Sequence, residues 1–569
     1  SSSNTFGHQG WTGTLTVIDP ESNLVVVLLT NKINSPVIDN TINANTFVGN
    51  KFTTATLGTI PTLVYDSIEH GNDSAVDANL ATMVTEKLKL YNPSNYQGEA
   101  VLKSACSIVE TMVTRAEERK VKSTVDYAKE SVKELETLVQ DKDIIDEFNR
   151  RINNISVGEE ASVDLSKITF TKLSGDPSAK WQADIAFPDC LGYVDDTLIV
   201  NNLYTFNGYE NQGKLYIKAN PGVTSARIFI NGVEMDTTEI CSNSGSTFEV
   251  DYSMVAKNGR NTIQVTNIDP KNTEVESGIS VKIPYPEVID GSAESVGMNK
   301  NTLDLIDTLI NNDVKNGFTS AQLAVIKDGV MVKNSAYGTV NAYNQDGTPK
   351  TDSPKVTTET LYDIASNTKM YSTNYAIQKL VSDGTINISD KITKFFPEFI
   401  DGENDPIKGK ANLTIQHILE HQAGFPADPQ YHNNKFNQET QKPDQNVDNP
   451  LYSQDKATTK EMILKTPLQY EPGTKTVYSD VDYMLLGLIV EKVTGMALDE
   501  YVENTFYKPL GLNNIVYNPL EKGFAKENIA ATELNGNTRD GAISFENIRD
   551  YTLQGEVHDE KAYYSMDGV

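Results

Sequence analysis

The chain has 569 residues, a formal net charge of −29 and a hydrophobic fraction of 38%. This length predicts two or three domains, and the apolar fraction is enough to build cores, which excludes a globally disordered chain. The acidic balance argues against nucleic acid and anionic membrane surfaces as partners, because both are bound through lysine and arginine.

Cysteine use and apolar runs exclude further classes of protein. The three cysteines, Cys106, Cys190 and Cys241, form no C-x-x-C pair, which excludes a zinc ribbon and a disulfide scaffold. One bridge between Cys190 and Cys241 is geometrically conceivable, because both lie in the same β-rich stretch. No apolar run approaches the about 20 residues that span a bilayer. Residues 1–13 lack the basic start and apolar run of a signal peptide, although a secreted protein in processed form would look the same.

The first two segments of the chain differ in the spacing of their apolar residues. Within residues 1–70, two strands are expected at 11–18 and 24–30, on either side of an Asp-Pro-Glu-Ser-Asn turn. Residues 71–156 are expected to be helical, because apolar residues recur there at three- and four-residue spacing. The clearest series is Val125, Ala128, Val132, Leu135 and Val139.

Residues 157–288 consist of short alternating runs separated by Asn-Gly and Pro-Gly turns, which predicts an antiparallel sandwich of immunoglobulin-like type. The segment Pro284-Tyr285-Pro286 is interpreted as a linker. The sandwich is therefore expected to be a domain of its own between two other parts of the chain.

Helices and strands mix over residues 289–569. Helical periodicity is found over 303–310, 367–382 and 482–493, and a hairpin is expected around Asp328-Gly329. The predicted fold class is α+β, an antiparallel sheet flanked by helices, with an added all-β immunoglobulin-like sandwich and a helical segment.

The tetrad Ser366-Asn367-Thr368-Lys369 is the first candidate for chemistry. If a helix begins at Ser366, the serine and Lys369 share one face, one turn apart. A serine hydroxyl becomes a good nucleophile only when a base takes its proton, and a lysine can be that base if burial and nearby cations lower its pKa. The helix N-terminus also places the Ser366 N–H near a developing oxyanion. Taken alone, the tetrad is a weak signal, because many helices contain Ser-x-x-Lys by chance, and it then favours a capping serine beside a solvated lysine.

Further motifs surround the tetrad in a fixed order. They are Tyr362-Asp363-Ile364-Ala365 before the serine, then 413–426, Tyr470-Glu471-Pro472-Gly473, Tyr478-Ser479-Asp480 and Pro509-Leu510-Gly511-Leu512. In this order and at these spacings, residues 298–569 resemble the serine β-lactamase-like hydrolases. That family includes class C β-lactamases, D-alanyl-D-alanine carboxypeptidases, and esterases and amidases of the same scaffold.

The resemblance implies roles for the matching positions. Ser366 is implied as the acylated nucleophile, Lys369 as the acceptor of its proton, and Tyr478 as the tyrosine that relays a proton to the leaving group. The third position of the Tyr478 motif, usually asparagine in the family, is Asp480. Because an ionised Asp480 only accepts hydrogen bonds, it puts β-lactam hydrolysis in doubt and favours a peptidase, amidase or esterase, with Asp480 facing the substrate.

His417 and His421 lie four residues apart and could share one helix face as a metal pair. No third ligand is evident near them in the sequence. The family motif explains both as packing and hydrogen-bonding residues, and neither a metal nor another cofactor is expected.

The family's third motif, Lys or His-x-Gly on a strand beside the site, is expected after the second. It is found instead at the start of the chain, as Gly7-His8-Gln9-Gly10-Trp11-Thr12-Gly13. The resemblance implies that His8 faces the substrate, that Gly10 allows close backbone approach, and that the Trp11 N–H is a second oxyanion donor. An exposed N-terminal turn without function is the alternative.

Two arrangements explain this order. The hydrolase domain is circularly permuted, so that residues 1–70 complete 289–569, or these segments are the tail of one unit and the head of the next. In both arrangements, the resemblance implies that this chain's hydrolase part lacks a helical stretch that the family carries between its second and third motifs. One composite domain is favoured.

The resulting prediction is a bacterial serine hydrolase that forms an acyl-enzyme on a peptidoglycan-derived peptide or amide, or on a related ester. A carboxylesterase and a catalytically inactive protein that binds the cell envelope are the alternatives. The expected location is extracellular or in the cell envelope, and the expected partners are a muropeptide or another small substrate, and peptidoglycan.

Overall fold

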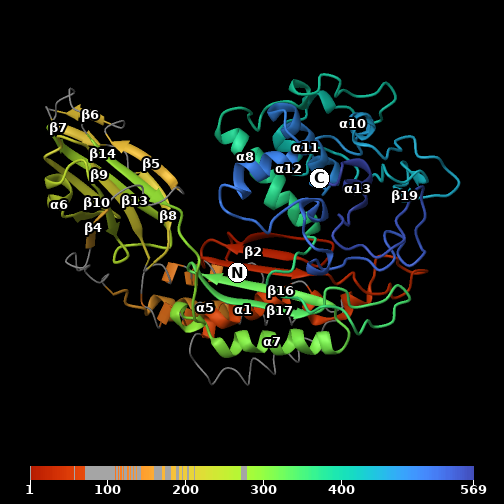
Figure 1. Ribbon diagram of the computed structural model, residues 1–569, viewed down its shortest axis with the longest axis horizontal. Helices are drawn as coiled ribbons and strands as arrows, with labels where there is room; N and C mark the ends of the chain where they lie inside the picture. The colour runs from red at the N-terminus through yellow and green to blue at the C-terminus, as the bar shows by residue number, and fades with distance from the viewer. Residues whose placement is uncertain are drawn as a thin grey trace.

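The computed structural model describes most of the chain. The described residues are 2–56, 58–70, 142–158, 169–173, 181–187, 191–194, 197–200, 204–210, 212–270 and 278–569, with single positions between 109 and 136. In Figure 1 a β-sandwich lies beside a larger unit, in which a sheet separates two layers of helices. This arrangement is the α+β fold with an added sandwich that the sequence predicts.

The central sheet has six strands in the order β1-β2-β3-β16-β17-β15. Their bounds are β1 Phe6–Gln9, β2 Leu15–Asp19, β3 Leu24–Thr30, β16 Ser320–Lys327, β17 Val330–Gly338 and β15 Ile289–Asp290. Strand β3 pairs antiparallel with β16, from Thr30 opposite Ala321 to Leu24 opposite Lys327. The first three strands therefore complete, within one chain, the sheet to which β16 and β17 belong (Figure 1).

One turn of this sheet is as the sequence predicts, and one strand begins later than predicted. Asp328 and Gly329 both have positive φ, 52° and 76°, as a two-residue hairpin between β16 and β17 requires. The strand expected at 11–18 begins only at Leu15, because Gly10–Gly13 forms a tight turn closed by the bond from Gly13 N to Gly10 O.

Helices α1 (Thr59–His70) and α7 (Lys300–Lys315) cover one face of the sheet (Figure 1). Helix α7 confirms the periodicity at 303–310, and its first turn is capped by the Asn299 side chain, which accepts from Thr302 N. The apolar faces of α1 and α7 and the inner face of the strands form one buried cluster with Leu24, Val26, Leu28, Leu63, Ile306, Leu323 and Val325 among its members.

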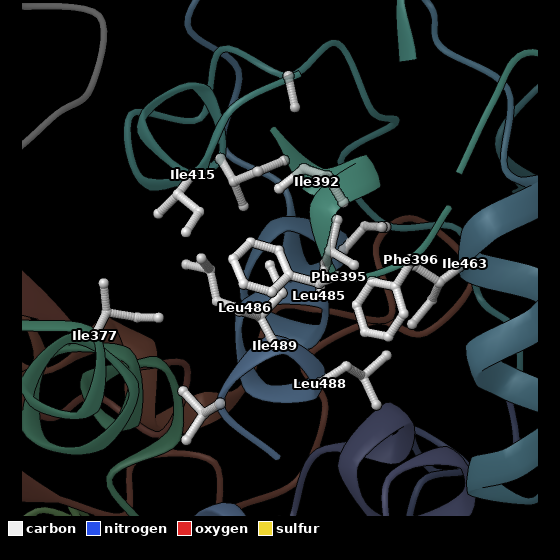
Figure 2. Packing of buried hydrophobic residues seen from close by; sticks show 14 of the residues in the cluster. Ile377, Ile392, Phe395, Phe396, Ile415, Ile463, Leu485, Leu486, Leu488 and Ile489 are labelled. Atoms are coloured by element: carbon white, nitrogen blue, oxygen red, sulfur yellow. The ribbon is translucent and has the colours of Figure 1, made fainter. Parts of the chain in front are cut away.

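The other face carries the helices α8 (Asn374–Ser382), α9 (Ile415–Leu419), α10 (Lys456–Lys465), α11 (Asp480–Thr494), α12 (Leu498–Val502) and α13 (Glu560–Ser565), and the short strands β18 (Phe436–Asn437) and β19 (Lys442–Pro443). Helix α11 is the centre of this layer and is buried along most of its length. Figure 2 shows Leu485, Leu486 and Ile489 of α11 surrounded by other apolar side chains. The core thus fixes the N-terminal end of α11, where the second sequence motif lies.

The sandwich consists of two antiparallel sheets. One contains β8 (Tyr204–Gly208), β10 (Ser225–Ile230), β11 (Val233–Met235) and β13 (Gly259–Asp269). The other contains β4 (Thr169–Leu173), β5 (Trp181–Phe187), β9 (Lys214–Ala219), β12 (Thr247–Asp251) and β14 (Ile279–Pro284). Strands β6 (Leu191–Val194) and β7 (Thr197–Val200) form a separate pair, and α6 (Thr238–Ser242) is a short helix. Inward side chains of both sheets form one core, as the alternating sequence predicts.

Helical positions are described in part of the segment 71–156. Val125, Ala128 and Val132 are helical and buried against Ile145 and Phe148 of α5 (Lys142–Asn153). Leu135 and Val139, the last two members of the predicted series, lie outside the described residues.

The cysteine bridge considered from the sequence is not formed at its described end. Cys241 is a free, buried thiol, and Cys106 and Cys190 lie outside the described residues. Among the helices that the structure describes, none is both long and apolar enough to cross a membrane.

Candidate active site

The turn that carries Ser366 is not the regular α-helix that the sequence predicts. Ala365–Asn367 forms a 3-10 turn, Lys369–Thr373 forms a π-helical turn, and the α-helical part starts only at Asn374. Ala365 has a φ of 46°, a left-handed conformation that is uncommon for a residue with a side chain, and its N–H donates to Asp363 Oδ1 at 2.8 Å. Irregular helical turns of this kind are frequent at functional sites.

Ser366 and Lys369 still lie one turn apart on the same side. Lys369 Nζ is 3.3 Å from Ser366 Oγ and donates to it. The lysine side chain is 14% exposed, so the ammonium is largely withdrawn from solvent. The serine and the lysine of the predicted pair therefore lie in contact in the structure.

The second motif meets this pair from α11. Ser479 caps the helix, its Oγ accepting from Val481 N, so that Asp480 is the first helical residue and Tyr478 precedes the helix. Lys369 Nζ is 3.0 Å from Asp480 Oδ1 and 5.0 Å from the centre of the Tyr478 ring. The structure thus brings together Ser366, Lys369, Tyr478 and Asp480, which are far apart in sequence.

The charge state of Lys369 differs from the sequence expectation. Burial acts to lower the pKa of Lys369, but the Asp480 carboxylate and, after it, Tyr478 outweigh burial and raise that pKa above its usual value. A lowered lysine pKa is favoured by nearby cations, whereas the charged group that Lys369 contacts is the Asp480 anion. Lys369 is consequently an ammonium in the resting site.

Asp480 has a second lysine partner. Its Oδ2 lies 3.2 Å from Lys561 Nζ, so each carboxylate oxygen faces an ammonium. Burial would raise the pKa of Asp480, but Lys561 and Lys369 together hold it well below its usual range. Contact of Asp480 with a substrate, as implied by the resemblance, stays a prediction.

The opening strand lies directly beside the Ser366 turn. Thr12 Oγ1 donates to the Asp363 carbonyl at 2.8 Å and Thr14 Oγ1 to the Ile364 carbonyl at 3.1 Å. When the Asn367 side chain is oriented so that both its nitrogen and its oxygen form hydrogen bonds, its nitrogen donates to the His8 carbonyl at 3.0 Å and its oxygen accepts from Gly10 N at 3.2 Å. The third motif thus lies against the nucleophile-bearing turn of the same molecule.

His8 approaches the site from the edge strand β1. Its ring centre lies 6.0 Å from that of Tyr478. Burial lowers the pKa of His8, against an opposing contribution from the Gln9 carbonyl that Nδ1 contacts at 2.7 Å. At neutral pH the imidazole is therefore uncharged and can serve as a hydrogen-bonding group.

Gly10 occupies a position where a side chain does not fit. A Cβ on Gly10 would lie 2.5 Å from the Ile364 carbonyl oxygen and 3.2 Å from Ala365 Cβ, and still nearer to Thr14 Oγ1. The sequence implies that a substrate backbone approaches Gly10 closely. In the structure, it is the turn carrying Ser366 that lies this close to Gly10.

Gly10→Ala is expected to push β1 away from the Ser366 turn. Overpacking of this kind costs about 1–3 kcal/mol, and a displaced nucleophile should lower kcat/KM about tenfold or more. Thermal unfolding and ester turnover measure the two effects. Gly158→Ala is the matched control, because a Cβ there meets nothing nearer than Lys120 O at 3.9 Å; equal effects of both changes would contradict the steric argument.

A cavity of about 990 Å³ opens over these residues. Trp11, Ser366, Lys369, Tyr478 and Asp480 line it, while His8 and Gly10 are not among the described residues that do. Trp11 is 40% exposed and Tyr478 42% exposed, which leaves both open to a bound molecule. A cavity of this size admits a peptide or another substrate of similar dimensions.

The two histidines considered as a metal pair have other partners. His417 Nδ1 lies 2.9 Å from Thr414 Oγ1 at the start of α9. His421 Nδ1 lies 2.8 Å from Asp482 Oδ2, and its ring centre is 4.6 Å from that of Tyr478. Within the described part of the chain, no group of three or more metal-ligating side chains is found.

Asp482 gives the site a titratable support beneath Tyr478. Its side chain is 1% exposed, and burial raises its pKa to about 6, although the bond to His421 acts in the opposite direction. His421 Nδ1 also accepts from Ser479 N at 3.2 Å. A protonated Asp482 that donates to the same nitrogen satisfies this geometry.

The free energy of unfolding should depend on pH through the protonation of Asp482. Because the pKa of Asp482 is higher in the folded protein than its usual 3.8, its stabilising contribution is complete below about pH 4 and is lost as the pH rises through 6. Asp482→Asn, which resembles the protonated form, should gain stability relative to the natural chain between pH 5 and pH 8, by up to about 3 kcal/mol. Urea unfolding at both pH values measures it; a difference independent of pH would contradict the assignment.

Several residues of the site were not identified from the sequence. Lys561 and His558 come from the last described segment, and the His558 N–H donates to Asp363 Oδ2 at 2.8 Å, just before the nucleophile. Arg539 lines the cavity and lies 5.8 Å above the Trp11 ring while paired with Glu533. The sequence around 557–561 is rich in charged residues, but nothing in their spacing predicts a contact with Asp480.

A serine and a lysine on one turn, a tyrosine above the ammonium, and an antiparallel sheet between two helical layers resemble the site and fold of the Ser-x-x-Lys serine hydrolases. Residues 306–551 match the family model described as Beta-lactamase. Over these residues the chain is similar to the serine β-lactamase-like hydrolases.

Two curated relatives bear the name "Putative D-alanyl-D-alanine carboxypeptidase". The protein of Escherichia coli (strain K12) is 54% identical over 286 residues, which cover 50% of this chain and 63% of the relative. That of Salmonella schwarzengrund (strain CVM19633) is 53% identical over 288 residues, 50% of this chain and 64% of the relative. The chain therefore spans less than two thirds of the length of these relatives.

Among solved structures, the octameric penicillin-binding protein homologue from Pyrococcus abyssi aligns with a TM-score of 0.31 at 22% identity. The alignment covers 44% of this chain and 50% of that one. A D-amino acid amidase from Ochrobactrum anthropi aligns with a TM-score of 0.31 at 19% identity, over 47% of this chain and 66% of that one.

Proposed function

We propose that the protein is a serine hydrolase that works through an acyl-enzyme on Ser366. The observation that carries the proposal is the 3.3 Å contact between Lys369 Nζ and Ser366 Oγ beside Tyr478, in the wall of a cavity. A hydroxyl held against a proton-transfer group and open to a substrate is what nucleophilic catalysis requires.

The reaction proceeds in two halves. Ser366 Oγ bonds to the substrate carbonyl carbon and gives up its proton, and the leaving nitrogen or oxygen takes a proton as its bond to that carbon breaks. Lys369 and Tyr478 lie where they can pass this proton, and the amides of Ser366 and Trp11 are the proposed donors to the oxyanion. Water then cleaves the ester on Ser366 and restores the hydroxyl.

The proposed substrate is a peptidoglycan-derived peptide that ends in D-alanyl-D-alanine. The names of the relatives support it, as does the size of the cavity. A hydrolase acting on such peptides belongs outside the cytoplasmic membrane of a bacterium, and we propose the cell envelope or the exterior as its location and peptidoglycan as its partner. An ester substrate on the same site is the second candidate, because Asp480 stands where a neutral amide is usual in the family.

The test combines an active-site probe with two substrates. A fluorophosphonate should add one adduct per chain, which a peptide map places on Ser366. A D-alanyl-D-alanine peptide should release D-alanine, whereas turnover of p-nitrophenyl acetate without D-alanine release would identify an esterase. Absence of any adduct would overturn the proposal and favour a protein that only binds the envelope.

A further inference from the structure

Lys561 joins the active site through a row of alternating charges. It lies on α13 (Glu560–Ser565), and its side chain is 7% exposed. Its Nζ is 2.6 Å from Asp428 Oδ1 and 3.2 Å from Asp480 Oδ2, and Asp480 Oδ1 is 3.0 Å from Lys369 Nζ. The row Lys369, Asp480, Lys561 and Asp428 lines one wall of the cavity.

The position of Lys561 is fixed by its helix. Asp559 caps α13, its side chain accepting from Ala562 N at 2.8 Å, so the helix starts one residue before Lys561. A buried ammonium is costly unless it is paired, and here two carboxylates face it. Removal of the lysine would leave Asp480, which is mostly buried, with a single cationic partner.

We propose, on the basis of the function proposed above, that Lys561 is a positioning residue of the active site: its ammonium holds the Asp480 carboxylate in place and offsets part of its negative charge, so that Lys369 can release a proton during the reaction. It acts through Asp480 and does not itself touch Ser366.

Lys561 changes the net charge that faces Lys369. An uncompensated carboxylate 3.0 Å away would bind the Lys369 proton strongly, since Coulomb energies are large where water is excluded. Lys561 places a positive charge on the far oxygen of that carboxylate, which weakens this attraction and repels the Lys369 ammonium. Loss of Lys561 should therefore raise the pKa of Lys369, and loss of the Asp480 charge should lower it.

Other charged and titratable groups face the same row from the neighbouring elements. Lys369 is influenced by Asp480, Tyr478, Tyr483, His8 and Asp482. Lys561 is influenced by Asp428, Asp559 and Asp480, and it acts in turn on Tyr431, His432 and Glu560. Apart from Asp480, none of these groups is changed by the variants below, and Lys561→Met leaves all of them in place, so a shift in that variant reports the charge of Lys561.

The test measures the proton affinity of Lys369 directly. Trace acetylation with acetic anhydride, followed by mass spectrometry, reports the neutral fraction of each lysine at a given pH. At pH 9.5, Lys369 should be acetylated about tenfold more slowly in Lys561→Met, and about tenfold faster in Asp480→Asn, than in the natural chain, one pKa unit in each direction. Lys379→Met is the matched control, because it removes an exposed lysine paired with Asp383 on α8.

Two further variants separate the charge of Lys561 from its hydrogen bonding and packing. Lys561→Arg retains the charge and should retain the natural acetylation rate. Lys561→Gln keeps a donor for Asp480 without the charge, and it should show the slower rate even if Lys561→Met does not fold. An unchanged Lys369 rate in the folded uncharged variants would overturn the role of Lys561. Because acetylation does not require hydrolysis, that result is distinct from a failure of fluorophosphonate labelling, which would overturn the proposed function instead.

Discussion

Ser366→Ala is expected to abolish fluorophosphonate labelling and to lower kcat/KM for an activated ester by on the order of 10⁴-fold or more. The reason is that no other hydroxyl replaces the bond-forming Oγ, and serine-hydrolase sites without their nucleophile keep only the modest acceleration of the binding and oxyanion groups. Steady-state turnover of p-nitrophenyl acetate and intact-mass analysis measure both effects on the same samples.

The fold should survive this change. The described side-chain contact of Ser366 Oγ is the bond from Lys369, and its loss should cost no more than about 1 kcal/mol of stability. Ser382→Ala, at the exposed end of α8, is the matched control and should leave labelling intact. Persistent labelling of the Ser366→Ala protein would show that another residue is the nucleophile.

Strongly periodic segments were predictable because local pattern and tertiary packing agree there. The helix at 303–310, the hairpin at Asp328-Gly329 and the alternating strands of the sandwich bury the faces that their spacing indicates. The pairing of His8 with the Ser366 turn was predictable from motif order alone, since the third motif has a fixed place beside the nucleophile in the family.

Other features depend on contacts that a sequence pattern does not contain. The sequence around Ser366 has helical periodicity, but the structure forms 3-10 and π-helical turns there. The hydrogen bonds from Thr12 and Thr14 to the two carbonyls at 363 and 364 hold that segment out of a regular helix. The late start of β2 has a similar cause, because the Gly10–Gly13 turn closes against the same segment.

Electrostatic partners were the least predictable part of the site. Lys561 and Asp480 are 81 positions apart by their numbers, and a lysine in an acidic stretch is usually a solvated residue. Only the folded arrangement shows that the Asp480 carboxylate lies beside Lys369, which reverses the expected direction of the pKa shift at Lys369, and that Lys561 faces the other oxygen of that carboxylate. Charge counts along the chain cannot show this, because pKa shifts depend on distance and burial.

Lys369→Met is expected to lower kcat/KM for the same ester by about 10²- to 10⁴-fold, the range typical of a lost general acid or base. Methionine keeps the apolar stem but removes the group that faces Ser366 Oγ at 3.3 Å. Because Asp480 raises the pKa of Lys369, the natural enzyme should gain activity with each pH unit across the alkaline range, with no plateau below about pH 10.

The response of that alkaline limb to substitution identifies the group that titrates. If the neutral amine of Lys369 takes the Ser366 proton, Lys369→Met should remove the limb altogether, and Asp480→Asn should move it to lower pH, because the carboxylate that holds the lysine proton is gone. An alkaline limb that survives in Lys369→Met would contradict this role of the lysine and assign the titration to another group.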